Sequence, residues 1–366
     1  MMIILYFFLL SLLSVYSFSL VDPNLTLFNN SVWAYFREIM VYFGYYRRDL
    51  SSIAYILLIL LLFFLSSRIA LRPKIKDLMK LTVLIGLITV FSYPFLSHDF
   101  FNYLFDAKIL TFYGKNPYAF KALDFPYDPW IRFMHWTHRT YPYGPSFLII
   151  SIAPSFLAAG KFILNYFFFK LTFVLFYFLS VFYLNKINHR VAIFFAFNPF
   201  VILEGLINNH NDLIAISLAF IGIYLFLHQN KTALGKIMLL ISGGIKYLTL
   251  PLVFLSANKK KFNNIVLLSL IFAIIYYSFQ VEIQPWYFLN LLIILPFFPK
   301  LVSQFNIFFA GLMLSYYPYI RFGQWTSPNN VSIKHWIITI FLGINLFVIL
   351  FKSKKLHAKK NARLFQ

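Results

Sequence analysis

Long apolar runs, separated by small clusters of Lys and Arg, are the feature that most limits what this chain can fold into. Of its 366 residues, 61% are hydrophobic and only 12% are charged. A soluble domain of this length has no room to bury so much apolar surface. Apolar runs of roughly 17–25 residues can cross a bilayer as helices. Because the runs are continuous rather than alternating, they favour helices over a β-barrel. We therefore expect an all-α, polytopic transmembrane helical bundle.

The positive charge of the chain has a topological explanation. The formal net charge is +21, which could suggest a nucleic-acid partner. The basic residues, however, flank the apolar runs, as membrane topology requires. We therefore expect membrane lipid around the chain and no nucleic acid. The absence of cysteine excludes disulfides and thiol ligands. Residues 1–20 lack the basic start and the small-residue cleavage site of a signal peptide, so an uncleaved first span is expected.

The placement of Lys and Arg predicts how the spans are oriented. If the basic clusters are cytoplasmic, successive spans alternate in direction across the membrane. Both termini then lie in the cytoplasm, with a basic cytoplasmic tail at 352–366. The whole chain, 1–366, then forms a single transmembrane domain of about 10–12 spans. The spans are expected near residues 2–20, 52–67, 80–97, 162–184, 191–205, 212–228, 264–280, 286–299, 301–320 and 335–351.

Three stretches fall outside this series. Residues 98–161 form a long outer, extracytoplasmic segment. Within it, Pro145–Ala159 is apolar but short, and we expect an interfacial or re-entrant helix there. Residues 232–257 begin and end beside basic residues, so this stretch crosses twice or not at all. Gly243-Gly244-Ile245-Lys246 interrupts its middle. We expect two short helices that meet at this break, surrounded by protein or by a watery cavity.

The acidic residues gather on the predicted outer side, with Asp77 as the exception. Longer outer loops would explain the scattered acids. Asp99 differs because it directly follows an apolar span, where an ionisable group is costly unless it is paired or functional. Alternatively, Ser97 or Asp99 caps the next helix. Asp99, Tyr103 and Asp106 are spaced by four and three and share one helical face. Apolar residues lie beside them, so an amphipathic helix in the membrane interface is expected.

A second polar cluster lies in the turn between two predicted spans. Asn208-Asn209-His210-Asn211-Asp212 follows Glu204 by one helical turn. Asp212 could simply cap the next helix, but five successive polar side chains exceed what a cap needs. Two lysines are candidates for binding an anion: Lys246 at the predicted break, and Lys170 inside the span 162–184. Lys170 could instead extend its charge toward the interface.

Several of these residues carry a resemblance to a known family. Asp99-x-x-x-Tyr103, Gly114-x-Asn116-Pro117-Tyr118 and Tyr143-Gly144-Pro145 resemble the first outer loop of GT-C membrane glycosyltransferases. The chain is most similar to the polyprenyl-phosphate-mannose-dependent mannosyltransferases, including glycosyltransferase family 87. This second likeness rests on Asn198-Pro199, Glu204, His210-Asn211-Asp212, Lys246 with Pro251, and Gln284-Pro285-Trp286-Tyr287. It covers roughly residues 80–300.

The resemblance implies a GT-C bundle with interfacial helices in the first outer loop. It implies an inverting hexosyltransferase that moves a hexose, mannose in this family, from a polyprenyl-phosphate donor to a glycan or lipid acceptor on the extracytoplasmic side. Asp99 matches the catalytic base, which takes the proton of the acceptor hydroxyl. Lys246 and Lys170 would stabilise the leaving phosphate.

No cofactor is implied. Some relatives carry paired acids that bind a metal, but His98-Asp99 and Asn211-Asp212 stand at those places here, so no metal ligands are assigned and a metal requirement stays open. The residues expected to bind substrate are His98, Tyr103, Asp106, Asn116, Tyr118, Tyr143, Glu204, His210, Asn211, Asp212, Trp286 and Tyr287.

Two other functions remain as alternatives. A transporter or flippase of a lipid-linked saccharide would show paired repeats and charges at the bilayer midplane, whereas no repeat is evident and the polar residues gather at outer span ends. An oligosaccharide polymerase or ligase typically concentrates its function in a large late loop, whereas the large loop of this chain is early.

Overall fold

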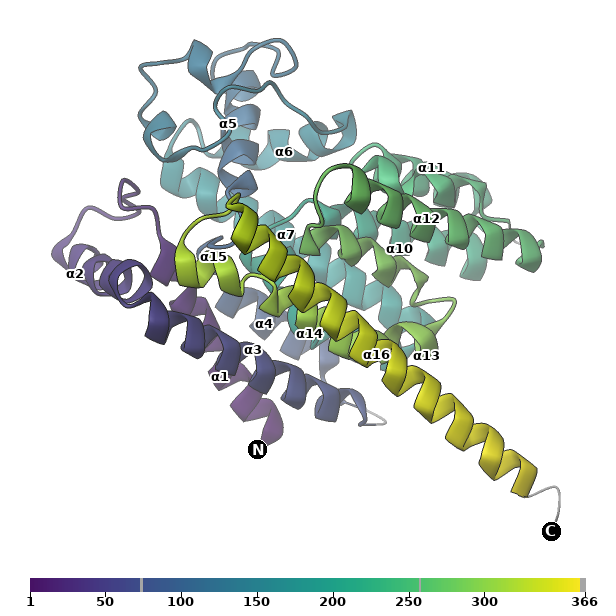
Figure 1. The fold of residues 1–366 in the computed structure, drawn as a ribbon. Coiled ribbons are helices and arrows are strands. Elements are labelled where there is room, and N and C mark those ends of the chain that lie inside the picture. Colours follow the sequence, from purple (N-terminus) through teal and green to yellow (C-terminus); the bar gives the residue numbers. More distant parts are fainter. Residues whose placement is uncertain (73–74, 257, 363–366) are drawn as a thin grey trace.

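The computed structural model describes residues 1–72, 75–256 and 258–362, with side chains described as far as Lys352. Within this part of the chain every regular element is a helix (Figure 1). The prediction of an all-α bundle is therefore confirmed. Most of the predicted tail at 352–366 lies outside the described side chains, and residues 363–366 lie outside the described chain.

Five helices among the described residues are long and apolar enough to cross a membrane, and a bent pair could make a sixth span. The pair, His189–Ala196 with Pro199–Ile207, bends by 54°. The bend follows from Asn198-Pro199: proline starts a new helix, and the Asn198 side chain accepts the N–H of Phe200 at 3.0 Å. The five long spans are Met2–Leu20, which comprises α1 (Met2–Tyr16) and a 3₁₀ turn (Ser17–Leu20), then α3 (Arg48–Ala70), α7 (Phe162–Ile187), α12 (Lys260–Gln280) and Pro328–Lys352 of α16 (Pro328–Ala362).

The other predicted spans are shorter helices. The span expected at 80–97 is α4 (Leu78–Val90), which ends before Pro94. The span expected at 286–299 is a 3₁₀ helix, Pro285–Ile294. The span expected at 301–320 is divided, because Pro318 starts a new helix after Leu314. Its pieces are α13 (Pro299–Val302), a 3₁₀ turn (Ser303–Phe305), α14 (Asn306–Leu314) and α15 (Tyr317–Phe322). The predicted number of 10–12 spans counted these short helices as full membrane spans.

The stretch at 232–257 contains the two short helices that were predicted. Helix α11 (Thr232–Gly243) ends at the glycine pair, and a 3₁₀ helix (Tyr247–Phe254) follows, so Lys246 lies in the break. The Lys236 ammonium donates to the carbonyls of Val253 and Leu255. These bonds hold the second helix back against the first, so the chain returns in the direction from which it came.

Helix α10 (Asp212–His228) lies at the centre of this half of the bundle, packed against α7 and α11. Close packing against α11 depends on two glycines, because a Cβ on Gly222 would meet the Gly235 carbonyl oxygen at 2.9 Å. An element that the sequence reading did not expect lies between the first two long spans. It consists of α2 (Ser31–Val41) and a π-helical turn (Tyr42–Tyr46).

Residues 98–161 form a layer at the end of the bundle opposite both termini (Figure 1). The layer contains α5 (Asp99–Thr111), two 3₁₀ turns (Ala122–Asp124 and Pro129–Phe133) and α6 (Pro145–Leu157). We expected α5 to be amphipathic with one face in the interface, but its residues from Phe100 to Ile109 are all buried. The loop at 112–144 covers the polar face, and a buried ion pair between Lys108 and Asp128 ties that loop to the helix.

Candidate functional site

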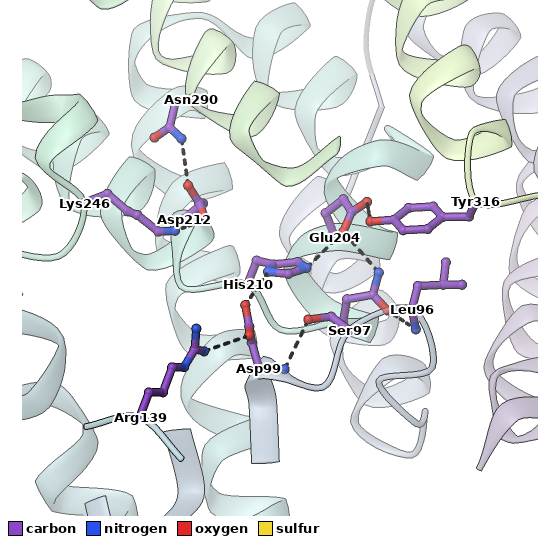
Figure 2. A network of polar contacts seen from close by, with 11 residues as sticks. Leu96, Ser97, Asp99, Arg139, Glu204, His210, Asp212, Lys246, Asn290 and Tyr316 are labelled. Atoms are coloured by element: carbon purple, nitrogen blue, oxygen red, sulfur yellow. Dashed lines mark hydrogen bonds and ion pairs between the residues drawn. The ribbon is translucent and has the colours of Figure 1, made fainter. Parts of the chain in front are cut away.

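Asp99 stands at the first position of α5 with its carboxyl group free of a capping role. The Ser97 hydroxyl accepts the Asp99 N–H at 3.3 Å. The Asp99 carboxylate instead faces two other segments: its Oδ1 lies 3.5 Å from Arg139 Nη2, and its Oδ2 lies 4.0 Å from His210 Nδ1. Figure 2 shows these partners converging on Asp99 from the loop after α5 and from the turn before α10. Capping therefore does not explain this carboxylate.

The polar turn at 208–212 is completely buried. A π-helical segment, Ile202–Ile207, leads into it, and Asn209 has a left-handed φ of 57°, a conformation that asparagine tolerates better than most residues. The ring of His210 stacks on Trp286, with centroids 4.2 Å apart and 13° between the planes. The tight turn and the stacking fix the imidazole beside Asp99.

Glu204 lies on the Nε2 side of the His210 ring, whereas Asp99 lies on its Nδ1 side. Its Oε2 is 3.4 Å from His210 Nε2 and accepts a bond of 3.1 Å from Asn208 Nδ2. Its Oε1 accepts the Tyr316 hydroxyl at 2.8 Å. The imidazole is therefore placed between two carboxylates, one on each side (Figure 2).

Asp212 and Lys246 form a second branch of the same group. Lys246 Nζ is 3.1 Å from Asp212 Oδ2, and Asp212 Oδ1 accepts a bond of 2.8 Å from Asn290 Nδ2. Asp212 therefore binds two distant segments rather than capping α10. The Lys246 ammonium also lies 5.8 Å from the centroid of the Tyr143 ring.

A close backbone approach brings the lysine to this position. The N–H of Ser146, at the start of α6, donates to the Gly244 carbonyl at 3.2 Å. A Cβ on Gly144 would lie 2.0 Å from that carbonyl oxygen. Only glycine leaves room for this contact, which fastens the break after α11 to the Tyr143-Gly144-Pro145 turn.

Exposure divides these side chains into an inner set and an outer set. The side chains of Glu204 and Asp212 are 0% exposed and that of His210 is 1% exposed, whereas Asp99 is 19%, Lys246 18% and Arg139 35% exposed. A substrate would therefore reach one carboxylate and two cations. The buried carboxylates and the imidazole hold that outer set in position.

The surroundings of Asp99 suit a base. Burial raises the pKa of its carboxyl group, and the charges of Arg139 and Lys246 oppose that rise. The two positive charges favour the ionised form that a base needs, and burial makes that carboxylate a stronger proton acceptor. Burial also raises the pKa of Asp106 to about 8 and lowers the pKa of His98 to about 3.

Within the described residues, no group of three or more His, Asp and Glu side chains is arranged to hold a metal ion. Charge near Asp99 is instead balanced by Arg139 and Lys246.

A family described as alpha-(1->6)-mannopyranosyltransferase, N-terminal domain, matches residues 20–258, more than half of the chain. The chain belongs to this family. A comparison with curated proteins and a comparison with solved structures each gave no match. The family assignment agrees with the resemblance seen in the sequence, and mannosyl transfer is the general activity it supports. With five helices that could cross a membrane, this mannosyltransferase is an integral membrane protein.

In the mannosyltransferase, six of the residues singled out from the sequence lie in one group, in which two sets of contacts meet at the turn 208–212. His210 contacts Asp99, Glu204 and Trp286, and Asp212 contacts Lys246. Sequence reasoning missed three members of the group. Arg139 lies in an irregular loop without periodicity. Asn290 lies in a 3₁₀ helix that resembled a full span, and Tyr316 lies in the turn between α14 and α15. No local pattern distinguishes these three residues from their neighbours.

Asn209 and Asn211 provide further polar groups in the buried turn. Neither side-chain amide makes a hydrogen bond to another described residue, although both residues are 0% exposed. Buried polar atoms normally have partners. Both amides are therefore buried polar groups without a partner among the described residues.

The tyrosines and His98 form an aromatic border along α5. Tyr103 packs edge-on against Tyr143, with centroids 5.1 Å apart, and its hydroxyl makes no hydrogen bond among the described residues. The Tyr118 hydroxyl donates to the Tyr143 carbonyl at 3.1 Å, while Asn116 accepts the Tyr118 N–H at 3.0 Å. His98 stacks on His135, with centroids 3.5 Å apart.

Two predicted ligand-binding residues have other contacts. Lys170 donates to Ser92 Oγ at 3.2 Å and to the carbonyls of Leu206 and Ile207 at 3.3 and 2.9 Å. It is 1% exposed, so it does not extend to the interface. It instead binds the carbonyls that lead into the polar turn. Tyr287 packs against Tyr277, with centroids 4.9 Å apart.

Proposed function

We propose that this protein is an inverting glycosyltransferase that moves a mannosyl group from a polyprenyl-phosphate donor to a glycan or lipid acceptor, with Asp99 as the base. One observation carries the proposal: Asp99, the most exposed carboxylate of the polar group, lies 3.5 Å from Arg139, and the positive charge of the partly exposed Lys246 also lowers its pKa. A glycosyl transfer from a sugar phosphate needs this combination, because a hydroxyl loses a proton while a phosphate leaves with negative charge.

The transfer takes place in a single displacement. An acceptor oxygen attacks the anomeric carbon, and its proton goes to the Asp99 carboxylate. The bond between the anomeric carbon and the phosphate oxygen breaks, and the phosphate leaves with the bonding electrons. Lys246 and Arg139 stabilise the charge that develops on it. One base suffices, and no covalent bond to the enzyme forms.

The family description supplies an expectation for the linkage. An α-(1→6) product places the attacking atom at the primary 6-hydroxyl of an acceptor hexose. Inversion at the anomeric carbon then requires a donor in which mannose is β-linked to phosphate. We propose that this enzyme shares that linkage, and that an α-linked donor is not a substrate.

We further propose that the reaction takes place on the extracytoplasmic side, with both termini in the cytoplasm. Two observations support this orientation. The layer at 98–161, from which Asp99 and Arg139 come, lies at the opposite end of the bundle from both termini (Figure 1). The chain ends in a run of Lys and Arg after residue 351, and such runs favour the cytoplasm.

The test uses the full-length protein in lipid vesicles with a short-chain polyprenyl phosphate carrying β-linked mannose and a mannoside acceptor. The Asp99→Asn variant should lose about 10²–10⁴-fold in transfer rate, the range that general-base catalysis contributes. Asp124→Asn is the matched control, because Asp124 is exposed in the same layer and its side chain accepts the N–H of Lys121 at 2.9 Å. Full activity of Asp99→Asn would disprove its role as base, and movement of the donor across the vesicle without product would support a flippase instead.

A further inference from the structure

Helix α2 (Ser31–Val41) and the π-helical turn after it expose an apolar face, although they lie outside the five candidate spans. They lie at the edge of the bundle, beside the ends of α1 and α3 (Figure 1). The rings of Tyr42 and Tyr46 stack, with centroids 6.0 Å apart, so these two side chains share a face. The tyrosine face consists of Val32, Tyr35, Ile39, Tyr42 and Tyr46, each with 47–78% of its surface exposed.

Helical periodicity divides α2 into three sectors. Trp33 and Met40 are buried against the protein, and the tyrosine face lies next to them. Arg37 and Glu38 belong to the remaining, polar sector: Arg37 donates to the Leu25 carbonyl at 3.1 Å, and Glu38 is exposed. A helix in a membrane interface turns one face to lipid and another to water, and tyrosine is enriched at that depth.

The neighbouring span indicates that lipid covers the tyrosine face. Exposed apolar side chains continue after this face along α3, at Leu50, Ile53 and Leu57, which are 44–54% exposed and spaced as one helical face. Because α3 is a candidate span, these side chains contact the bilayer. The tyrosine face directly precedes them in the chain, so the same bilayer can cover both.

The turn after α2 is fastened to the end of the first span. A Cβ on Gly44 would lie 1.6 Å from the Ser19 carbonyl oxygen, so only glycine permits this close approach. The Tyr45 hydroxyl donates to the Leu20 carbonyl at 3.3 Å. These contacts fix the position of α2 relative to the first span.

A chain of aromatic contacts leads from α2 to α5, the helix that begins with Asp99. Trp33 packs on Phe18 with ring centroids 5.8 Å apart, and Phe18 packs on Tyr93 with centroids 5.9 Å apart. Tyr93 in turn packs on Phe101 of α5, with centroids 5.7 Å apart. The depth of α2 in the membrane therefore determines the depth of Asp99.

We propose that the tyrosine face lies in the lipid headgroup region, at the end of the bundle that carries residues 98–161, and that this contact sets the depth of the candidate site. A donor phosphate that its own lipid chain holds at headgroup level then meets Lys246 and Arg139 while the chain stays in the bilayer. The lipid contact is independent of the function proposed above, whereas its effect on the donor rests on that function.

The first test locates single fluorophores on α2, in the full-length protein in lipid vesicles. The chain has no cysteine, so Tyr35→Cys and Glu38→Cys each introduce one labelling site. The label at Tyr35→Cys should be quenched most by lipids with a nitroxide on the headgroup, and little by aqueous iodide. The label at Glu38→Cys, in the polar sector, should be quenched by iodide. Leu60→Cys, exposed in the middle of α3, should be quenched most by a nitroxide deep in the acyl chains.

Three results would overturn the lipid contact as proposed. Equal quenching of both α2 labels by iodide would place the tyrosine face in water. Quenching of the Tyr35→Cys label at the same depth as the Leu60→Cys label would place it in the hydrocarbon core. Protection from all quenchers, with disulfides between copies of Tyr35→Cys, would show that a second copy of the chain covers the face.

The second test examines whether α2 sets the depth of the candidate site. Tyr35→Ser combined with Ile39→Ser should lower kcat/KM for a long-chain polyprenyl donor in vesicles by about tenfold, because two apolar side chains lose their lipid contact. It should leave kcat/KM for a water-soluble, short-chain donor unchanged. Glu38→Ser is the matched control and should change neither value. A parallel loss with both donors, or no loss with either, would overturn the role in setting depth.

The two proposals fail in distinguishable ways. The quenching test needs no transfer activity, and it is repeated in the Asp99→Asn variant. The expected quenching pattern supports the lipid contact whether or not Asp99 is the base. Full transfer by Asp99→Asn refutes only the assignment of the base, and iodide quenching of both α2 labels refutes only the lipid contact.

Discussion

Lys246 Nζ lies 3.1 Å from the carboxylate of Asp212, although the two residues come from different elements. Asp212 is completely buried at the start of α10, whereas Lys246 is partly exposed in the break after α11. A lysine in such a break would otherwise have many conformations. The ion pair with the buried carboxylate fixes one of them, and from this position the lysine charge lowers the pKa of Asp99.

Loss of the lysine charge should slow the transfer step. We expect Lys246→Gln to lower kcat by about 10²–10³-fold, the range seen when one stabilising donor is removed from a developing anion. Lys115→Gln is the control, because Lys115 is exposed in the layer at 98–161. Asp212→Asn should also lower kcat, but the double variant should be no slower than Lys246→Gln alone, since Asp212 acts through the lysine. Additive losses would contradict this positioning role.

The pH dependence of transfer should report the cation beside Asp99. Burial raises the pKa of Asp99 and Arg139 opposes the rise, so Arg139→Gln should raise this pKa further. Asp99 must be ionised to act as a base, and activity therefore falls as pH drops through its pKa. The acidic limb of kcat/KM should move to higher pH in Arg139→Gln and stay in place in Arg132→Gln, a change at an exposed arginine of the same loop. An unshifted limb would show that Arg139 does not act on the base.

Replacement of Lys170 should affect stability before it affects donor binding. Lys170→Met leaves three buried oxygens without their donor, and each unpaired group costs about 1–3 kcal/mol. We expect a lower melting temperature and a parallel loss of activity. Lys186→Met, at an exposed position of the same helix α7, should change neither. A normal melting temperature with a raised donor KM would instead assign the lysine to phosphate binding.

Asp106 should make stability depend on pH. Burial raises its pKa to about 8, above the value of about 3.9 for an unfolded chain. Between these values the folded state retains a proton that the unfolded state releases, so stability falls as pH rises from about 4 to about 8. Asp106→Asn should therefore raise the melting temperature at pH 8 and change it little at pH 4. An equal gain at both values, or none, would contradict a buried protonated carboxyl. Asp124→Asn, at an exposed position, should show no such difference.

The sequence allowed much of the candidate site to be predicted. Asp99 and the turn at 208–212 can be recognised in the sequence. Placing acidic or amide side chains beside apolar spans costs free energy unless they have a partner or a function. Lys246 could be found because a glycine pair interrupts an apolar stretch. These signals are local, and each is visible within a few residues of chain.

Contacts between distant segments could not be predicted in the same way. Arg139 reaches Asp99 across 40 residues, and Tyr316 reaches Glu204 across 112. Nothing in the sequence around Arg139 or Tyr316 encodes these pairings. Lys170 shows the converse problem: a lysine inside an apolar helix can extend to the interface or bind buried carbonyls, and only the position of the π-helical segment next to it decided the outcome.

The sequence by itself determined that this chain is a helical membrane protein and predicted Asp99 as a candidate site residue, because hydrophobic length and the cost of an ionisable group at a span end are properties of short segments. Only the tertiary structure decided that α5 is covered on all sides, that several predicted spans are short helices, and which cations face the carboxylate. Those outcomes depend on how the helices pack and on which distant segments come into contact. Such packing is a property of the whole bundle.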